Sequence, residues 1–193
     1  MHARKERVDR AVADFVRVLV ARTEALLGED LLALSLVGSL STGDAHPATS
    51  DIDVLVLVDQ APDGARRDGL ADEVVALGLE CPWAGVEYVV SQADAVRAPT
   101  YPLRYTLNVN AGPRRDTHVS VGGDPAHWFL LDVAMARQLA TPLRGPRPSD
   151  LIGEPPTADA LRARHDRGPR LDEDRVGAFL ASVARRVDHR MPQ

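Results

Sequence analysis

The chain has 193 residues, of which 45% are hydrophobic, so it is long enough for one domain with an ordinary core, with or without a small appendage. Its formal net charge of -5 argues against a protein that wraps nucleic acid by neutralising phosphates, and we expect no stable nucleic-acid binding. Its single cysteine, Cys81, excludes an internal disulfide. Because no secretory signal or membrane-length apolar stretch is visible, we expect a cytoplasmic protein without a membrane partner.

The first part of the chain predicts a helix and two strands. Apolar residues recur at helical spacing over residues 5–27, and Gly28 ends this helix. The apolar run 31–37 predicts a buried strand, and residues 38–50, rich in Gly, Ser and Thr, predict a loop with one helical turn. Residues 51–58 form the clearest strand, because their continuous apolar half indicates burial on both faces of a sheet.

Weaker patterns follow in the middle of the chain. Apolar spacing predicts a helix at about 65–78, and Val-rich residues 85–90 predict another strand. Two alternating runs, 103–109 and 117–121, predict further strands joined by a turn at Gly112-Pro113.

The last part of the chain predicts two helices around a proline-rich stretch. Asp124-Pro125 is a good helix start, and apolar residues at helical spacing continue that helix to Leu139. Residues 141–158 are rich in proline and predict a linker, and a final helix is expected at about 173–189.

This order predicts an α/β (α+β) fold with a small mixed sheet flanked by helices and a short C-terminal helical tail. We expect a main domain over residues 1–145, a linker over 146–158 and a short helical segment over 159–193.

Two carboxylates at the start of the clearest strand are the strongest functional signal. Asp51 and Asp53 are two residues apart, so their side chains emerge on the same face. Carboxylates this close repel each other unless a cation lies between them. Mg²⁺ prefers oxygen ligands and usually keeps waters and phosphate oxygens in its shell. The pair therefore predicts a magnesium site.

The preceding loop predicts a phosphate-binding turn. Gly38 and Ser39 come where a strand breaks into a loop, twelve residues before the acidic pair. Glycine lets the backbone approach a ligand closely, and free N–H groups with a serine hydroxyl can bind phosphate oxygens. With Ser50 directly before Asp51, we expect Gly38, Ser39 and Ser50 to bind a nucleotide whose triphosphate carries the metal.

The whole motif resembles a known family. Val37-Gly38-Ser39-Leu40-Ser41-Thr42-Gly43-Asp44 and Ser50-Asp51-Ile52-Asp53-Val54-Leu55-Val56 are similar to the signature of the DNA polymerase β-type nucleotidyltransferase superfamily. Segments 107–112, 132–137 and 143–146 also resemble the aminoglycoside adenylyltransferases of the streptomycin/spectinomycin type. The resemblance covers about residues 30–155 and implies a polymerase β-like nucleotidyltransferase fold.

The resemblance also implies a third carboxylate on a neighbouring strand. Glu87, in the predicted strand 85–90, is the matching candidate. In the adenylyltransferases such a glutamate is thought to remove the proton from the attacking hydroxyl. Glu87, Asp51 and Asp53 are therefore our candidate catalytic residues and metal ligands, with Glu87 as base, as second-metal ligand, or as both.

These observations predict a Mg²⁺-dependent enzyme that transfers AMP from ATP, or another nucleoside monophosphate, to a small hydroxylated acceptor and releases pyrophosphate. The resemblance points to an aminoglycoside-like acceptor. The helical domain that closes the site in those enzymes corresponds here to residues 159–193 alone. The acceptor therefore differs, a second subunit completes the cleft, or the chain is a shortened relative. The alternatives are a minimal nucleotidyltransferase that modifies a protein or RNA, as in toxin–antitoxin pairs, and a catalytically impaired nucleotide-binding module.

Overall fold

The computed structural model describes residues 2–100, 103–122 and 128–155. The predicted start of a helix at Asp124-Pro125 and the predicted helix at 173–189 lie outside the described residues. The described elements, in chain order, are α1 (His2–Leu27), the 3₁₀ turn η1 (Gly28–Asp30), β1 (Leu31–Leu36), α2 (Gly38–Thr42), β2 (Ile52–Val58), α3 (Gly64–Leu79), β3 (Val86–Gln92), α4 (Ala93–Arg97), β4 (Leu107–Gly112), β5 (Arg115–Ser120), α5 (Trp128–Leu139), β6 (Thr141–Arg144) and α6 (Pro148–Leu151).

The strands form one mixed sheet in the order β5-β4-β3-β2-β1-β6. β2 and β3 are parallel, and the other neighbouring pairs are antiparallel. The predicted mixed sheet flanked by helices is therefore confirmed. β2 lies inside the sheet, and the near-complete burial of its apolar residues explains their continuous run in the sequence.

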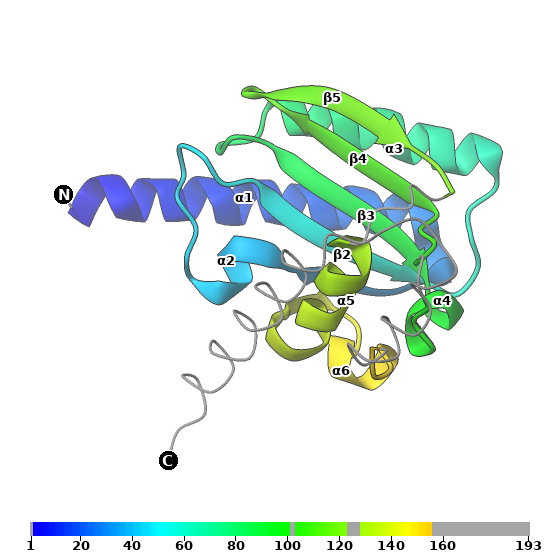
Figure 1. Cartoon of the computed structure of the whole chain (residues 1–193). Helices are drawn as coiled ribbons and strands as arrows, with labels where there is room; N and C mark the ends of the chain where they lie inside the picture. The colour runs from blue at the N-terminus through cyan, green and yellow to red at the C-terminus, as the bar shows by residue number, and fades with distance from the viewer. Residues whose placement is uncertain (1, 101–102, 123–127, 156–193) are drawn as a thin grey trace, which may run out of the picture.

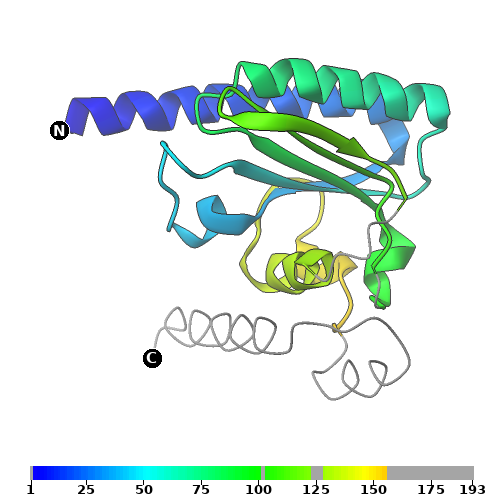
Figure 2. The same cartoon turned by 45° about the horizontal axis from the view of Figure 1, so that its top comes forward.

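Helices cover both faces of this sheet, and each face has its own core (Figures 1 and 2). α1 and α3 pack on one face, where β2 contributes Ile52, Val54, Val56 and Val58. α4, α5 and α6 lie on the other face, to which Leu55 and Leu57 point. Because side chains alternate along a strand, Asp53 shares the face of Leu55. The fold thus directs the acidic end of β2 towards α5.

The β4–β5 hairpin is displaced from its prediction. The run 103–109 is not one strand, because β4 begins at Leu107 and continues to Gly112. A Cβ atom on Gly112 would lie 2.3 Å from the Cα of Gly85, so this glycine allows two backbones to pack closely instead of starting the turn. The turn consequently falls one residue later, at 113–114, and β5 begins at Arg115.

The predicted linker is wrong for the part of it that the structure describes. β6 pairs antiparallel with β1 at the edge of the sheet, and Pro148 occupies the first turn of α6. Gly145 joins them at φ +78°, and a Cβ atom there would lie 2.1 Å from the carbonyl oxygen of Leu32. The prolines fit an edge strand and a helix start, so proline content alone misled the prediction. The proposed domain boundaries stay predictions.

In the part of the chain that the structure describes, no helix has both the length and the apolar character needed to span a bilayer.

Candidate active site

Two of the predicted carboxylates lie side by side on the central parallel strands. Asp53 on β2 is paired in register with Glu87 on β3. Equivalent positions on neighbouring strands place both side chains on the α5 face of the sheet. Both side chains are partly buried. The sheet alone therefore brings together two acidic residues that are 34 positions apart in sequence.

The turn between β1 and α2 lies directly against Asp53. Gly38 has φ +60°, a conformation that side chains disfavour, and a Cβ atom on it would lie 1.9 Å from Oδ2 of Asp53. The backbone N–H of Ser39 donates a hydrogen bond to the Asp53 carboxylate. Position 38 therefore requires glycine for two independent reasons, its backbone conformation and its contact with the carboxylate.

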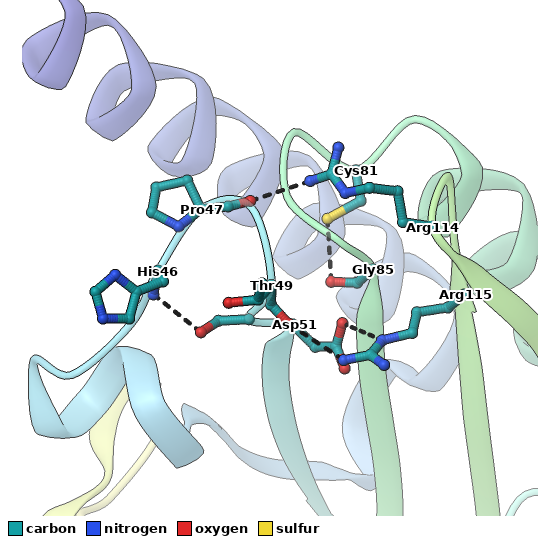
Figure 3. Close-up of polar contacts among 9 residues, drawn as sticks. His46, Pro47, Thr49, Asp51, Cys81, Gly85, Arg114 and Arg115 are labelled. Atoms are coloured by element: carbon teal, nitrogen blue, oxygen red, sulfur yellow. Dashed lines mark hydrogen bonds and ion pairs between the residues drawn. The ribbon is translucent and has the colours of Figure 1, made fainter.

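Asp51, the third predicted carboxylate, forms an ion pair with an arginine that the sequence analysis did not single out. Nε of Arg115, the first residue of β5, donates to Oδ1 of Asp51 over 2.9 Å (Figure 3). Asp51 precedes β2 and is charge-coupled to both Asp53 and Glu87. The structure therefore places Asp51 within electrostatic reach of Asp53 and Glu87, with the positive charge of Arg115 beside it.

A fourth carboxylate joins this group from α5. Asp132 lines the same pocket as Asp53 and Glu87. Its side chain is exposed to the cleft, and desolvation by the surrounding protein, together with the charges of Glu87 and Asp53, raises the pKa of Asp132 to about 8.

Burial and mutual repulsion also shift the pKa values of the paired carboxylates. Burial raises the pKa of Asp53 to about 7, with contributions from Glu87 and Asp51, although the Ser39 N–H and Arg115 oppose the rise. Burial and the Asp51 charge likewise raise the pKa of Glu87. Such clusters of perturbed carboxyl groups are typical of functional sites.

The predicted serines lie in the turns beside the carboxylates and take part in local hydrogen bonds. The carbonyl oxygen of Ser39 accepts a hydrogen bond from the hydroxyl of Thr42 at 3.1 Å, and its backbone N–H bonds to Asp53. The hydroxyl of Ser50 accepts a hydrogen bond from the backbone N–H of His46 at 2.9 Å and closes the turn before Asp51. Their roles in nucleotide binding stay predictions.

A pocket of about 110 Å³ extends from the carboxylates along the sheet towards α5. Asp53, Glu87 and Asp132 line it, together with Gly38, Ser91 and Tyr105 and the apolar side chains of Val37, Val54, Leu55, Val89, Leu103 and Val133. The pocket therefore combines an acidic end with mainly apolar walls, which is the usual composition of a small-molecule site.

The donor set fits a divalent cation, although the carboxylates are not arranged as a finished coordination cluster. Within the described ranges, no three His, Cys, Asp or Glu side chains form a group placed to hold a metal. Asp51, Asp53 and Glu87 are hard oxygen donors, and the Asp53 carboxylate packs directly against the backbone of Gly38, where a side chain would collide with it. These three residues could hold Mg²⁺ once the Asp51 carboxylate shares its oxygens between a cation and Arg115.

Sequence reasoning missed two residues of this site. Asp132 carried a usable signal, because it is the one carboxylate in the otherwise apolar stretch 128–136. Arg115 carried none, since it lies 64 residues from Asp51 and reaches it through the hairpin register alone.

Comparison with known proteins supports the predicted class. Residues 23–91 match the model of the nucleotidyltransferase domain family. The match covers less than half of the chain and, with the fold, supports the prediction of a nucleotidyltransferase domain that includes these residues.

Within this class, the fold resembles that of an adenylyltransferase. Spectinomycin adenyltransferase AAD(9) from Enterococcus faecialis, solved with ATP and spectinomycin, superimposes with a TM-score of 0.63 at 14% identity, over 80% of this chain and 65% of that one. The chain thus spans less than two thirds of the length of that enzyme. A toxin–antitoxin structure with AMP-PNP has a TM-score of 0.40 at 15% identity over 86% of this chain and 97% of its own, too low to bear on the fold. No curated protein matches the sequence significantly.

Proposed function

We propose that the protein transfers AMP from ATP to a hydroxyl group of a small acceptor and releases pyrophosphate in a Mg²⁺-dependent reaction. The single observation that carries this proposal is the pairing of Asp53 with Glu87 at the acidic end of the pocket, directly beneath the Gly38 turn. A nucleotidyltransferase needs carboxylates for a cation, a tight turn for phosphates and an adjoining space for the acceptor, and this arrangement supplies all three.

Asp51 and Asp53, with Glu87, are the residues proposed to hold the cation. When bound, the ion would neutralise charge on the triphosphate and favour attack at the α-phosphorus. The turn at Gly38 and Ser39, with Ser50, would bind phosphate oxygens through backbone N–H groups and hydroxyls.

Glu87 is proposed to act as the general base. The acceptor oxygen forms a bond to the α-phosphorus, the bond from that phosphorus to the β-bridging oxygen breaks, and the hydroxyl proton passes to the Glu87 carboxylate. A raised pKa makes this carboxylate a stronger base than an ordinary surface glutamate, and burial is the main cause of that rise. The pocket beside Glu87 would orient the attacking hydroxyl.

The pocket supports an acceptor with a compact apolar body and a hydroxyl group at the acidic end. Val89, Leu103 and Val133 would contact the body, and Asp132 would face a polar or cationic substituent. An aminoglycoside-like acceptor would supply the hydroxyl group and the cationic substituent for the acidic end, although its body is polar. The similar fold of a spectinomycin adenyltransferase supports this choice of acceptor for the first test.

The test is acceptor-dependent pyrophosphate release from labelled ATP and Mg²⁺. Streptomycin, spectinomycin, a candidate partner protein and tRNA are offered separately, with Glu87→Gln as the matched control because it keeps the shape of the side chain and removes the base. We expect release with a small hydroxylated acceptor, label on that acceptor and loss of turnover in the Glu87→Gln variant.

Other outcomes would redirect the proposal. Label on protein or RNA would replace the small acceptor with a macromolecule. ATP binding without turnover with any acceptor would favour a nucleotide-binding module. Full activity in the Glu87→Gln variant would remove Glu87 from the reaction.

A further inference from the structure

Two consecutive arginines hold the segment that leads into β2. Arg114 donates from Nη2 to the carbonyl oxygen of Pro47 at 3.0 Å. Arg115 donates from Nη2 to the carbonyl oxygen of Thr49 at 3.3 Å and from Nε to Asp51 at 2.9 Å (Figure 3). The start of β5 therefore fixes a segment more than 60 residues earlier, but Arg115 alone of these two arginines contacts a carboxylate of the site.

Close glycine packing directs Arg115 to Asp51. A Cβ atom on Gly85 would lie 2.9 Å from Cγ of Arg115, so the arginine stem crosses the bare backbone of this glycine. The carbonyl oxygen of Gly85 accepts the backbone N–H of Ile52 at 2.8 Å and the thiol of Cys81 at 3.2 Å, which anchors the glycine beside the start of β2. The position of the guanidinium is therefore built into the sheet.

Arg115 acts electrostatically on more than its hydrogen-bond partner. Burial and neighbouring carboxylates raise the pKa values of Asp53 and Glu87, whereas the Arg115 charge lowers both. One guanidinium thus offsets part of the repulsion within the acidic group. A divalent cation would perform the same role with twice the charge.

We propose that Arg115 is the internal counter-cation of the metal-free site and that a divalent cation competes with it for the Asp51 carboxylate. The inference rests on the proposed function, because it assumes the metal site at Asp51 and Asp53. The Arg115 side chain is 48% exposed and that of Asp51 19% exposed. Ion pairs this open to solvent are weak, so a divalent cation can displace this one at small cost.

The test measures binding of Mn²⁺ alone, without nucleotide, by electron paramagnetic resonance on the full chain. Arg115→Gln removes the charge, and Arg114→Gln is the matched control at the neighbouring position. We expect Arg115→Gln to bind Mn²⁺ about three- to tenfold more tightly than wild type, because a competing positive charge is gone. Arg114→Gln should retain the wild-type affinity for Mn²⁺. Arg115→Lys, which keeps the positive charge, should have an affinity close to that of wild type.

A second readout is the melting temperature in EDTA and in saturating Mn²⁺. Arg115→Gln should melt below wild type in EDTA, because the carboxylates lose their counter-cation, and Mn²⁺ should stabilise it more than it stabilises wild type. Equal or weaker Mn²⁺ binding by Arg115→Gln would overturn the inference and leave the metal site standing. If neither wild type nor any variant binds Mn²⁺, with or without ATP, the proposed metal site itself fails and the inference falls with it.

Discussion

The two faces of the sheet differ in what they contain. The face against α1 and α3 holds the larger hydrophobic core, in which the buried hydroxyls of Tyr88 and Thr23 bond to each other at 2.8 Å. The face against α5 holds a smaller core beside a pocket with three acidic side chains, at Asp53, Glu87 and Asp132. β2 and β3 build both faces, because their side chains alternate. Stability and the proposed chemistry therefore lie on opposite sides of the same two strands.

This difference implies that, without a bound cation, the ionised carboxylates on the α5 face destabilise the folded protein. Burial and repulsion raise the pKa of Asp53 to about 7, so ionising it in the folded protein costs free energy. Functional sites commonly break stability rules that the rest of a protein obeys. Substitutions on the two faces should consequently have opposite effects on stability and activity.

The largest expected effect is loss of activity on the acidic face. Asp53→Asn keeps the shape of the side chain but removes a charge that the proposed cation needs, so we expect turnover to fall by about 10³-fold or more. Its melting temperature without metal should equal or exceed that of wild type, because a repelling charge is gone. Pyrophosphate release and thermal melting in EDTA measure the two quantities. A variant with wild-type turnover would show that the site is misassigned.

The converse substitution weakens the hydrophobic core against α1 and α3. Leu19 of α1 is 1% exposed and belongs to the α1–α3 core. Leu19→Ala should lower the free energy of unfolding by about 2–5 kcal/mol, through lost burial and a cavity. Urea denaturation measures this loss, and Mn²⁺ affinity should stay unchanged under folding conditions. Val18→Ala on the same helix, at a side chain 39% exposed, is the control and should change stability by less than about 0.5 kcal/mol.

Several features of the two faces could be predicted from the sequence. The strands β1, β2 and β3 were placed within two residues of their bounds, because buried apolar runs and flanking glycines mark them clearly. Strand periodicity predicted that Asp51 and Asp53 share a face, and the family resemblance predicted Glu87 as the third carboxylate; the roles of these residues stay predictions. The nucleotidyltransferase class followed from the motif that contains these residues.

What could not be predicted depends on tertiary contacts. The antiparallel pairing of β6 with β1 rests on a close approach at Gly145, which no local pattern reveals. The partner of Asp51 is set by the register of the β4–β5 hairpin, which was predicted one residue early. Asp132 shares its pocket with Glu87 because α5 packs on that face. The spacing of residues within α5 does not reveal which face of the sheet the helix covers.

A smaller effect should appear in the pH dependence of stability. The pKa of Asp53 is about 7 in the folded protein against an ordinary value of 3.8, so the folded state binds the proton more tightly. This contribution is fully present below about pH 4 and is lost as the pH rises through 7. Without metal, wild type should therefore lose about 2 kcal/mol relative to Asp53→Asn between pH 5 and pH 8. Urea denaturation across this range, repeated with Mg²⁺, should show the difference shrink when the cation is present; a constant difference in EDTA would contradict the shift.

The smallest expected effect tests the buried hydrogen bond between Tyr88 and Thr23 in the core against α1 and α3. Tyr88→Phe removes the hydroxyl that Thr23 contacts and leaves the threonine hydroxyl buried without that partner. We expect a loss of about 1–2 kcal/mol in the free energy of unfolding, and no change in metal affinity because this side chain points away from the pocket. Adding Thr23→Val should recover part of the lost free energy of unfolding, because the double variant has no buried threonine hydroxyl without a hydrogen-bond partner. Equal stability of the single and double variants would show that the hydroxyl finds another partner, and a change in metal affinity would show that the two faces are coupled through β3.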